Sequence, residues 1–328
     1  MRWARVWGGA LILLLLVPGG LEYRLQQAGV KPEIIGDFGL WAVWRDRVYA
    51  APEERVMVGL GSSRMQVGIS TEVMASLRPQ IRFVQLAAVA SHPPAVLRDL
   101  AADPGFSGIV LCDLHENALT NRYFESQQGY VDFHHGKWNP DRHLHRLIRL
   151  FLEQHLSIMS FSANPLVYRN LYAIVTGRRE APRPVHELHA DRWRPADFRR
   201  IPQRSLQHRL KLARTRFDTF GIDREEWDRN AARMRDWVEQ IRARGGEVVF
   251  LRMPTSGDLL RNESALIPRR VYWDRLAKLT TAITIHFQDV AGLDDFVLPD
   301  ASHLDIRDAG AFTRALLREL KRRGVIHR

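Results

Sequence analysis

The stretch 56–70, VMVGLGSSRMQVGIS, constrains this chain more than any other. Its apolar run 56–60 ends at Gly61, and a segment with helical spacing follows. A continuous apolar run that is too short for a buried helix predicts a strand buried on both faces of a parallel sheet. Ligands bind outside the carboxyl ends of such strands, so chemistry is expected near Ser62 and Ser63. The alternative is that one serine only caps the next helix.

Strand-like and helix-like segments alternate around this stretch. The pattern stops after the third strand and resumes near residue 245. Alternation at this spacing predicts an α/β fold with a parallel sheet and right-handed crossovers. The predicted strands are 56–60, 82–88, 108–112, 247–251 and 287–290, and the predicted helices beside them include 71–78, 95–102 and a closing helix at 309–323.

Between the two halves of the sheet lies a long basic segment. Residues 121–245 hold 24 Lys and Arg against 15 Asp and Glu, which carries most of the whole chain's formal charge of +11. Apolar residues recur here at helical spacing. We therefore expect 121–244 to form an inserted, Arg-rich helical subdomain that acts as a lid or a docking face. Its predicted helices are 144–161, 166–175, 203–220 and 224–244.

The N-terminus has the pattern of a segment handled by the export machinery. Arg2 and Arg5 precede an apolar stretch over 6–21, which Pro18-Gly-Gly interrupts. No small-x-small cleavage site follows cleanly, so residues 1–21 are expected to be an uncleaved, single-pass membrane anchor. The bulk of the chain then lies outside the cytoplasm, in the periplasm or at the cell surface. A cleaved signal, giving a secreted protein, and a buried helix are the alternatives.

Residues 22–54 are expected to form a connector and a helix. Trp41 and Trp44 of this helix can pack on the domain or lie near lipid, and packing is the more usual role for such side chains. The one cysteine, Cys112, lies in an apolar strand. It cannot form an internal disulfide, and it is expected to fill the core and not to act as a nucleophile.

The basic charge does not by itself indicate a nucleic-acid partner. The chain has no zinc-finger spacing, no basic-aromatic RNA signature and no basic tail, so an anionic membrane surface or an anionic glycan explains the charge better. Two histidine pairs, His134-His135 and His143 with His145, lack Cys partners or a His-Glu-x-x-His helix. We expect them in solvated loops, and we expect neither a metal nor a cofactor.

Asp300 and His303 are three residues apart in a loop before the closing helix. One turn can present both side chains, with the carboxylate holding one imidazole nitrogen while the other faces a serine. A serine nucleophile needs such a base and such an orienting acid. The pair follows the end of a sheet whose first strand ends in Gly-Ser-Ser, so the three groups are expected to meet.

These motifs resemble those of the SGNH (GDSL-like) hydrolase superfamily over roughly 55–117 and 245–323. The first block, Gly61-Ser62-Ser63, matches Ser63 to the family's nucleophile. The last block matches Asp300 and His303. Ser62 stands where the family usually has Asp, as in the branch that acts on cell-envelope polymers. The resemblance implies a flavodoxin-like three-layer parallel sheet.

The two middle blocks depart from the family pattern. Ala90 stands where a Gly is usual, and His115-Glu116-Asn117 keeps only the Asn of the third block. The resemblance implies an oxyanion hole made by Ser63, Ala90 and Asn117. Each missing donor would cost about 3 to 4 kcal/mol of transition-state stabilisation. Arg64 and Arg252 are expected at the same edge of the sheet, as substrate-binding residues or as structural ion pairs.

The resemblance implies a serine esterase or O-acyltransferase that acts on acylated, most simply O-acetylated, cell-envelope glycan. The catalytic domain would comprise 55–120 and 245–328. The alternative is a weak or inactive protein of the same fold that serves as a scaffold for envelope-assembly partners, which the altered third block favours. Composition and motifs do not name the acyl group, the acceptor, or which of the two serines attacks.

Overall fold

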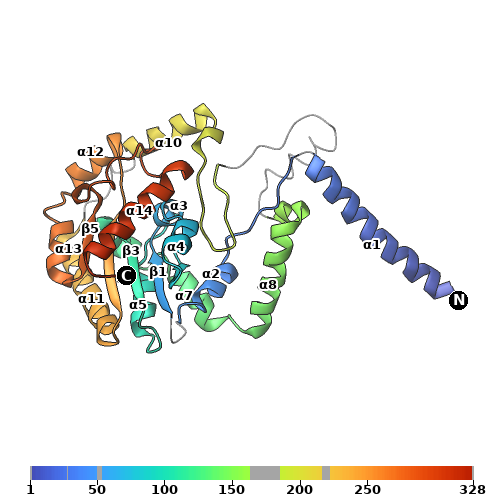
Figure 1. Ribbon diagram of the computed structural model, residues 1–328, viewed down its shortest axis with the longest axis horizontal. Coiled ribbons are helices and arrows are strands. Elements are labelled where there is room, and N and C mark those ends of the chain that lie inside the picture. The colour runs from blue at the N-terminus through green and yellow to red at the C-terminus, as the bar shows by residue number, and fades with distance from the viewer. Residues whose placement is uncertain (1, 28, 50–53, 163–184, 216–221, 327–328) are drawn as a thin grey trace.

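The computed structural model describes residues 2–27, 29–49, 54–162, 185–215 and 222–326 (Figure 1). Its centre is a five-stranded sheet with the strand order β2-β1-β3-β4-β5, in which every neighbouring pair is parallel. This is the flavodoxin-like order, whose switch point lies between β1 and β3. The strands are β1 (Arg55–Leu60), β2 (Ile81–Gln85), β3 (Ile109–Asp113), β4 (Glu247–Arg252) and β5 (Ile283–His286).

Helices cover both faces of the sheet and give it three layers. Two separate apolar cores fill the spaces between the sheet and its helices. The predicted α/β class and three-layer architecture are therefore confirmed. One face carries α2 (Phe38–Arg45), α5 (Pro94–Ala102), α7 (Gln128–Gly136), α11 (Arg224–Ala243) and α13 (Trp273–Thr280), and the other carries α3 (Ser63–Gly68), α4 (Thr71–Leu77) and α14 (Ile306–Arg322).

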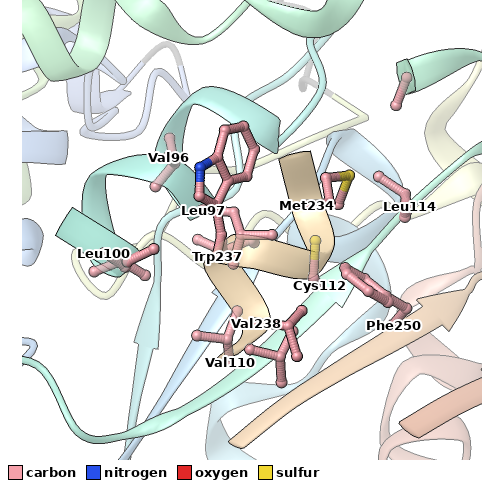
Figure 2. Packing of buried hydrophobic residues seen from close by; sticks show 14 of the residues in the cluster. Val96, Leu97, Leu100, Val110, Cys112, Leu114, Met234, Trp237, Val238 and Phe250 are labelled. Atoms are coloured by element: carbon pink, nitrogen blue, oxygen red, sulfur yellow. The ribbon is translucent and has the colours of Figure 1, made fainter. Parts of the chain in front are cut away.

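Helix α11 belongs to the cover of the sheet. Figure 2 shows Trp237 of α11 beside Leu97 of α5, and Val238 of α11 beside Val110 of β3. Its apolar stripe is thus explained by the sheet beneath it. The division into domains stays a prediction, but the part of 121–244 that begins at α11 forms the crossover from β3 to β4.

The other elements between β3 and β4 are shorter. One predicted helix, 166–175, and the end of another, 203–220, lie outside the described residues. The elements are η1 (Glu116–Leu119), α6 (Asn121–Phe124), α8 (Pro140–His155), η2 (Ser157–Ser162), η3 (Phe198–Arg200) and α10 (Gln203–Thr215), and α12 (Gly257–Leu266) and η4 (Phe287–Asp289) follow later in the chain.

The prediction of a fifth strand at 287–290 is wrong. Strand β5 is Ile283–His286, and the next three residues form the 3₁₀ turn η4. β5 is an edge strand that pairs only with β4. Its apolar residues Ile283 and Ile285 alternate with Thr284 and His286 instead of forming the continuous apolar run of a central strand.

Helix α1 (Arg2–Gln27) projects away from the rest of the molecule (Figure 1). It continues through Pro18, where the sequence predicts an interruption. Its part Arg5–Gln27 is long and apolar enough to cross a membrane, and no other helix among the described residues passes this test. This fits either a membrane anchor or a signal sequence.

The two tryptophans of α2 pack on the domain, as predicted. Trp41 is buried and its Nε1 donates to the carbonyl of Leu86 at 2.9 Å. Trp44 donates to the carbonyl of Ala190 at 2.8 Å. Helix α2 is thus fastened to the end of β2 through a buried indole.

Candidate active site

The turn from β1 to α3 can be made only around a glycine. Gly61 has a φ of +151°, and a Cβ there would lie 2.8 Å from the Cβ of Asp113 and 2.9 Å from that of Met65. After this turn Ser62 caps α3, since its Oγ accepts from the N–H of Arg64 at 3.4 Å. The same hydroxyl lies 3.4 Å from Asp113 Oδ2 and donates to it. Ser62 is therefore occupied as a helix cap.

Ser63, the first residue of α3, meets the loop that precedes α14. Its Oγ lies 2.9 Å from His303 Nε2, although the two residues are 240 positions apart. His303 Nδ1 in turn lies 2.9 Å from Asp300 Oδ2. The three side chains form a hydrogen-bonded chain at the carboxyl edge of the sheet, with the connectivity of a nucleophile, a base and an orienting acid.

Asp300 is held as a carboxylate. Its Oδ1 accepts from the backbone N–H groups of Ser302 and His303 at 3.1 and 2.9 Å. Burial would raise the pKa of Asp300, but its hydrogen bonds with His303, Ser302 and Arg209 outweigh burial and lower the pKa to about 2. An ionised Asp300 fixes the proton on Nδ1 of His303 and leaves Nε2 to accept from the Ser63 hydroxyl.

Two residues of the segment between β3 and β4 also reach this site. Arg209 of α10 donates to Asp300 Oδ2 at 3.1 Å, and the ring of His186 lies 6.1 Å from that of His303, centroid to centroid. Burial, with help from the charges of His303 and nearby arginines, lowers the pKa of His186 to about 4. Sequence reasoning missed both residues, because no local motif marks them and only the fold brings them to Asp300.

The Ser63 hydroxyl opens into a cavity of about 480 Å³. The three residues expected to form an oxyanion hole, Ser63, Ala90 and Asn117, all line it. Ala90 has a φ of +55°, in the left-handed region that favours glycine, so the chain adopts the glycine conformation despite its β-carbon. The buried Oδ1 of Asn117 has no hydrogen-bond partner among the described residues.

The cavity has one apolar wall and one polar wall. The apolar wall comes from α10, α12 and the residue after α12, including Leu212, Ala213, Leu259 and Ile267. Helix α10 is fixed there by contacts of Leu210 and Ala213 with Leu259 and Ala301. Helix α10 of the basic segment thus forms part of the cavity wall, and a lid role for the segment stays a prediction. The polar wall includes Arg64, Ser91, His92, Arg122 and Tyr123.

The structure separates the two arginines that were expected to bind substrate. Arg64 lines the cavity, and its Nη2 lies 3.2 Å from Glu263. Arg252 is buried, pairs with Glu116 at 3.1 Å and with Glu263 at 2.7 Å, and donates to the carbonyl of Met253. It is not among the described residues that line the cavity. Arg252 therefore forms structural ion pairs, which is the alternative expected for it, and its position gives substrate binding no support.

Glu263 of α12 joins the elements behind the cavity. Oε1 lies 2.9 Å from His115 Nε2, and Oε2 accepts from Arg252 and from Thr255, each at 2.7 Å. Burial would raise the pKa of Glu263, but the nearby cations, Arg252 first, hold it well below its usual value. This carboxylate ties α12 to β4 and, through Arg64, to α3.

The histidine pairs lie in helices and not in solvated loops. His134 of α7 and His143 of α8 lie 2.9 and 3.2 Å from Asp46, and His135 contacts Asp99. Each pair thus fastens α7 or α8 to a neighbouring element. In the described ranges no group of three or more His, Cys, Asp and Glu is arranged to hold a metal ion.

Comparisons with known proteins add little to this geometry. No protein-family profile matches the chain, and no curated protein matches it. Among solved structures, the crystal structure of TesA is similar over 82% of this chain and 99% of that one, with 12% identity and a TM-score of 0.38. A likeness of this size assigns no family and no activity, so the fold and the site rest on the geometry described above.

Proposed function

We propose that this protein is a serine esterase or O-acyltransferase that acts on acylated, and most simply O-acetylated, cell-envelope glycan. The observation that carries the proposal is the 2.9 Å contact between Ser63 Oγ and His303 Nε2, with Asp300 on the other side of the ring. The Gly61-Ser62-Ser63 and Asp300-x-x-His303 motifs, which resemble those of SGNH hydrolases, support it independently.

In the proposed reaction Ser63 Oγ attacks the carbonyl carbon of the ester while its proton passes to His303 Nε2. The oxyanion is stabilised by the N–H groups of Ser63 and Ala90 and the amide of Asn117, which line the cavity. The N–H of Ser63 is at the first position of α3, where the helix itself does not use it. The tetrahedral intermediate collapses, the C–O bond to the alcohol breaks, and His303 returns the proton to the leaving oxygen.

The resulting acyl-enzyme is resolved by a second hydroxyl. Water or a sugar hydroxyl gives its proton to His303 Nε2 and attacks the acyl carbon, and the Ser63 oxygen then leaves and regains a proton. Water gives an esterase, and a sugar gives a transferase. The apolar wall of the cavity suits the acyl group, and the polar wall suits a glycan. The apolar helix α1 fits an enzyme held at the envelope.

A fluorophosphonate reagent tests the proposal on the purified full chain. We expect covalent labelling of the wild type, loss of labelling in Ser63→Ala and in His303→Gln, and labelling retained in Ser62→Ala. Ser62 is the matched control because it is the adjacent serine and its hydroxyl caps α3. Acetate release from O-acetylated xylan or peptidoglycan, with and without an added sugar acceptor, then separates hydrolysis from transfer.

A folded wild type that takes no label, or a Ser63→Ala variant that labels as well as the wild type, would contradict the proposal. Either result would favour the alternative, in which the fold serves as a scaffold for an envelope-assembly complex.

A further inference from the structure

Helix α8 (Pro140–His155) buries charged residues and exposes apolar ones, which is the reverse of a surface helix in a soluble domain. Its most buried residues are Arg146 and Glu153, which are 3% and 0% exposed. Its large apolar side chains Leu144, Ile148 and Phe151 are 61%, 54% and 60% exposed. A surface helix normally buries its apolar stripe. The burial of charge and exposure of apolar groups together indicate that a second environment covers the outer face.

The two faces are opposite each other. At about 100° per residue, positions 144, 148 and 151 fall within roughly 60° of one another, and positions 146 and 153 lie about 180° from them. The inner face is satisfied by charge pairing: Arg146 contacts Asp37 at 3.0 Å and Glu153 at 3.1 Å. The inward orientation of α8 is therefore fixed by ion pairs, and the apolar stripe cannot turn inward without breaking them.

Helix α8 lies next to the point where α1 leaves the molecule. The Glu22 carboxylate of α1 accepts from the N–H groups of Ser157 and Ile158, both at 2.8 Å, and Leu25 is fully buried. Ser157 begins η2, two residues after the end of α8. Figure 1 shows α8 as the outermost element of the body on the side from which α1 projects.

The aromatic residues of α1 indicate where the two surfaces of a membrane would meet this helix. Exposed Trp3 and Trp7 lie near one end of the helix and exposed Tyr23 near the other. The helix rises about 30 Å between Trp3 and Tyr23, which is the thickness of a hydrocarbon core. Trp and Tyr are enriched where such a core meets water. Tyr23 adjoins Glu22, so a membrane crossed by α1 has its surface at η2 and at the C-terminal end of α8.

Basic side chains around the start of α8 suit an anionic lipid surface. Lys137 lies just before α8, His145 lies beside the stripe, and Arg142 lies on the same face as Arg146 near the N-terminal end; all three are exposed. An interfacial helix combines an apolar face with basic residues in this way.

From these observations we infer that α8 is a second membrane contact: its stripe of Leu144, Leu147, Ile148 and Phe151 lies in the headgroup–acyl boundary of the bilayer that α1 crosses. The inference rests on α1 acting as an anchor and is independent of any activity at Ser63. The α/β domain would then be held against the membrane at two places, by the span and by α8.

Site-directed fluorescence tests this on the full chain, reconstituted in vesicles of phosphatidylcholine and phosphatidylglycerol. Ile148→Cys and Phe151→Cys are labelled with an environment-sensitive dye, and Glu239→Cys is the control, since Glu239 is exposed on α11, which lies at the opposite end of the body from α8 (Figure 1). The native Cys112 is fully buried, so it does not react in the folded protein. Circular dichroism checks that each variant folds.

We expect nitroxides on the lipid acyl chains to quench most of the fluorescence at positions 148 and 151 and little at 239, and aqueous iodide to show the reverse order. Quenching of 148 and 151 by iodide alone would overturn the inference. So would protection from both quenchers, which would mean that another part of the chain or a second copy covers the stripe. A protein that does not float with the vesicles would remove its premise, while fluorophosphonate labelling of Ser63 would be unaffected.

Discussion

The position that most tightly constrains the candidate site is Gly61. Its φ of +151° and the two β-carbons that would lie within 3 Å of an added methyl group leave no room for a side chain in the β1–α3 turn. We expect Gly61→Ala to lower the free energy of unfolding by about 1 to 3 kcal/mol and to abolish fluorophosphonate labelling, because Ser63 must shift. Gly136→Ala in α7, where a methyl meets nothing within 4 Å, is expected to change stability by about 1 kcal/mol at most, in the opposite direction. Urea denaturation compares the two.

Arg209 bears on the pH dependence of catalysis. Its guanidinium donates to Asp300 Oδ2, and this hydrogen bond helps to lower the pKa of the Asp300 carboxyl. In Arg209→Ala the pKa of Asp300 should rise, so Asp300 is protonated at higher pH and the acid limb of the kcat/KM profile should move upward. Arg209→Lys keeps the charge and should leave the limb in place. A change in KM alone, with an unmoved limb, would show that Arg209 only contacts substrate.

At the scale of elements, α12 is attached to the sheet by a buried carboxylate. The carboxylate of Glu263 is the buried partner of both Arg252 and His115. Removing one member of a buried ion pair costs about 3 to 5 kcal/mol. Glu263→Ala should therefore lower the free energy of unfolding by about that much, measured by urea denaturation. Glu239→Ala on the exposed face of α11 should change it by less than about 0.5 kcal/mol. Equal effects for the two variants would count against a structural role for Glu263.

Sequence patterns predict an element well when all of its residues lie in the same surroundings, as in a strand that is buried on both faces. β1, β3 and β4 are buried on both faces and appear as continuous apolar runs, so their predicted bounds agree with the observed ones to within one or two residues. β5 has only one neighbouring strand, and its alternating pattern gives no such run. The outer face of α11 is densely charged with both signs. This makes α11 look like part of a charged insertion, although its stripe from Trp227 to Ile241 covers the sheet.

At the scale of the whole molecule, two imidazoles, one buried and one half-buried, make the free energy of unfolding depend on pH. Burial lowers the pKa of both His186 and His286 to about 4 from 6.5. The folded chain therefore binds fewer protons than the unfolded chain between these values. Above pH 6.5 both imidazoles are neutral in the folded and the unfolded chain, and the free energy of unfolding has its full value. As the pH falls toward 4 the unfolded chain takes up these protons first, so the free energy of unfolding drops by up to about 3 kcal/mol for each histidine. The urea midpoint should fall over this range, and it should fall less in His286→Gln. An equal fall in that variant would assign the acid sensitivity to other groups.

The meeting of Ser63 with His303 and Asp300 could be predicted because each motif sits at a recognisable place in an α/β chain. The surroundings of that chain of hydrogen bonds could not. Arg209, His186 and Glu263 come from segments that no local pattern links to the serine, and only the folded arrangement of α10, α12 and 185–200 brings them there. The exclusion of Arg252 from the cavity has the same origin, because burial is a property of the fold.

The position of Cys112 has a consequence for the redox chemistry of the folded chain. It is the only cysteine in the chain, it is fully buried beneath α11, and burial raises the pKa of its thiol well above the usual value. A thiol that is neither ionised nor accessible does not exchange with disulfides. The folded chain therefore does not crosslink to other proteins through this thiol, even under oxidising conditions.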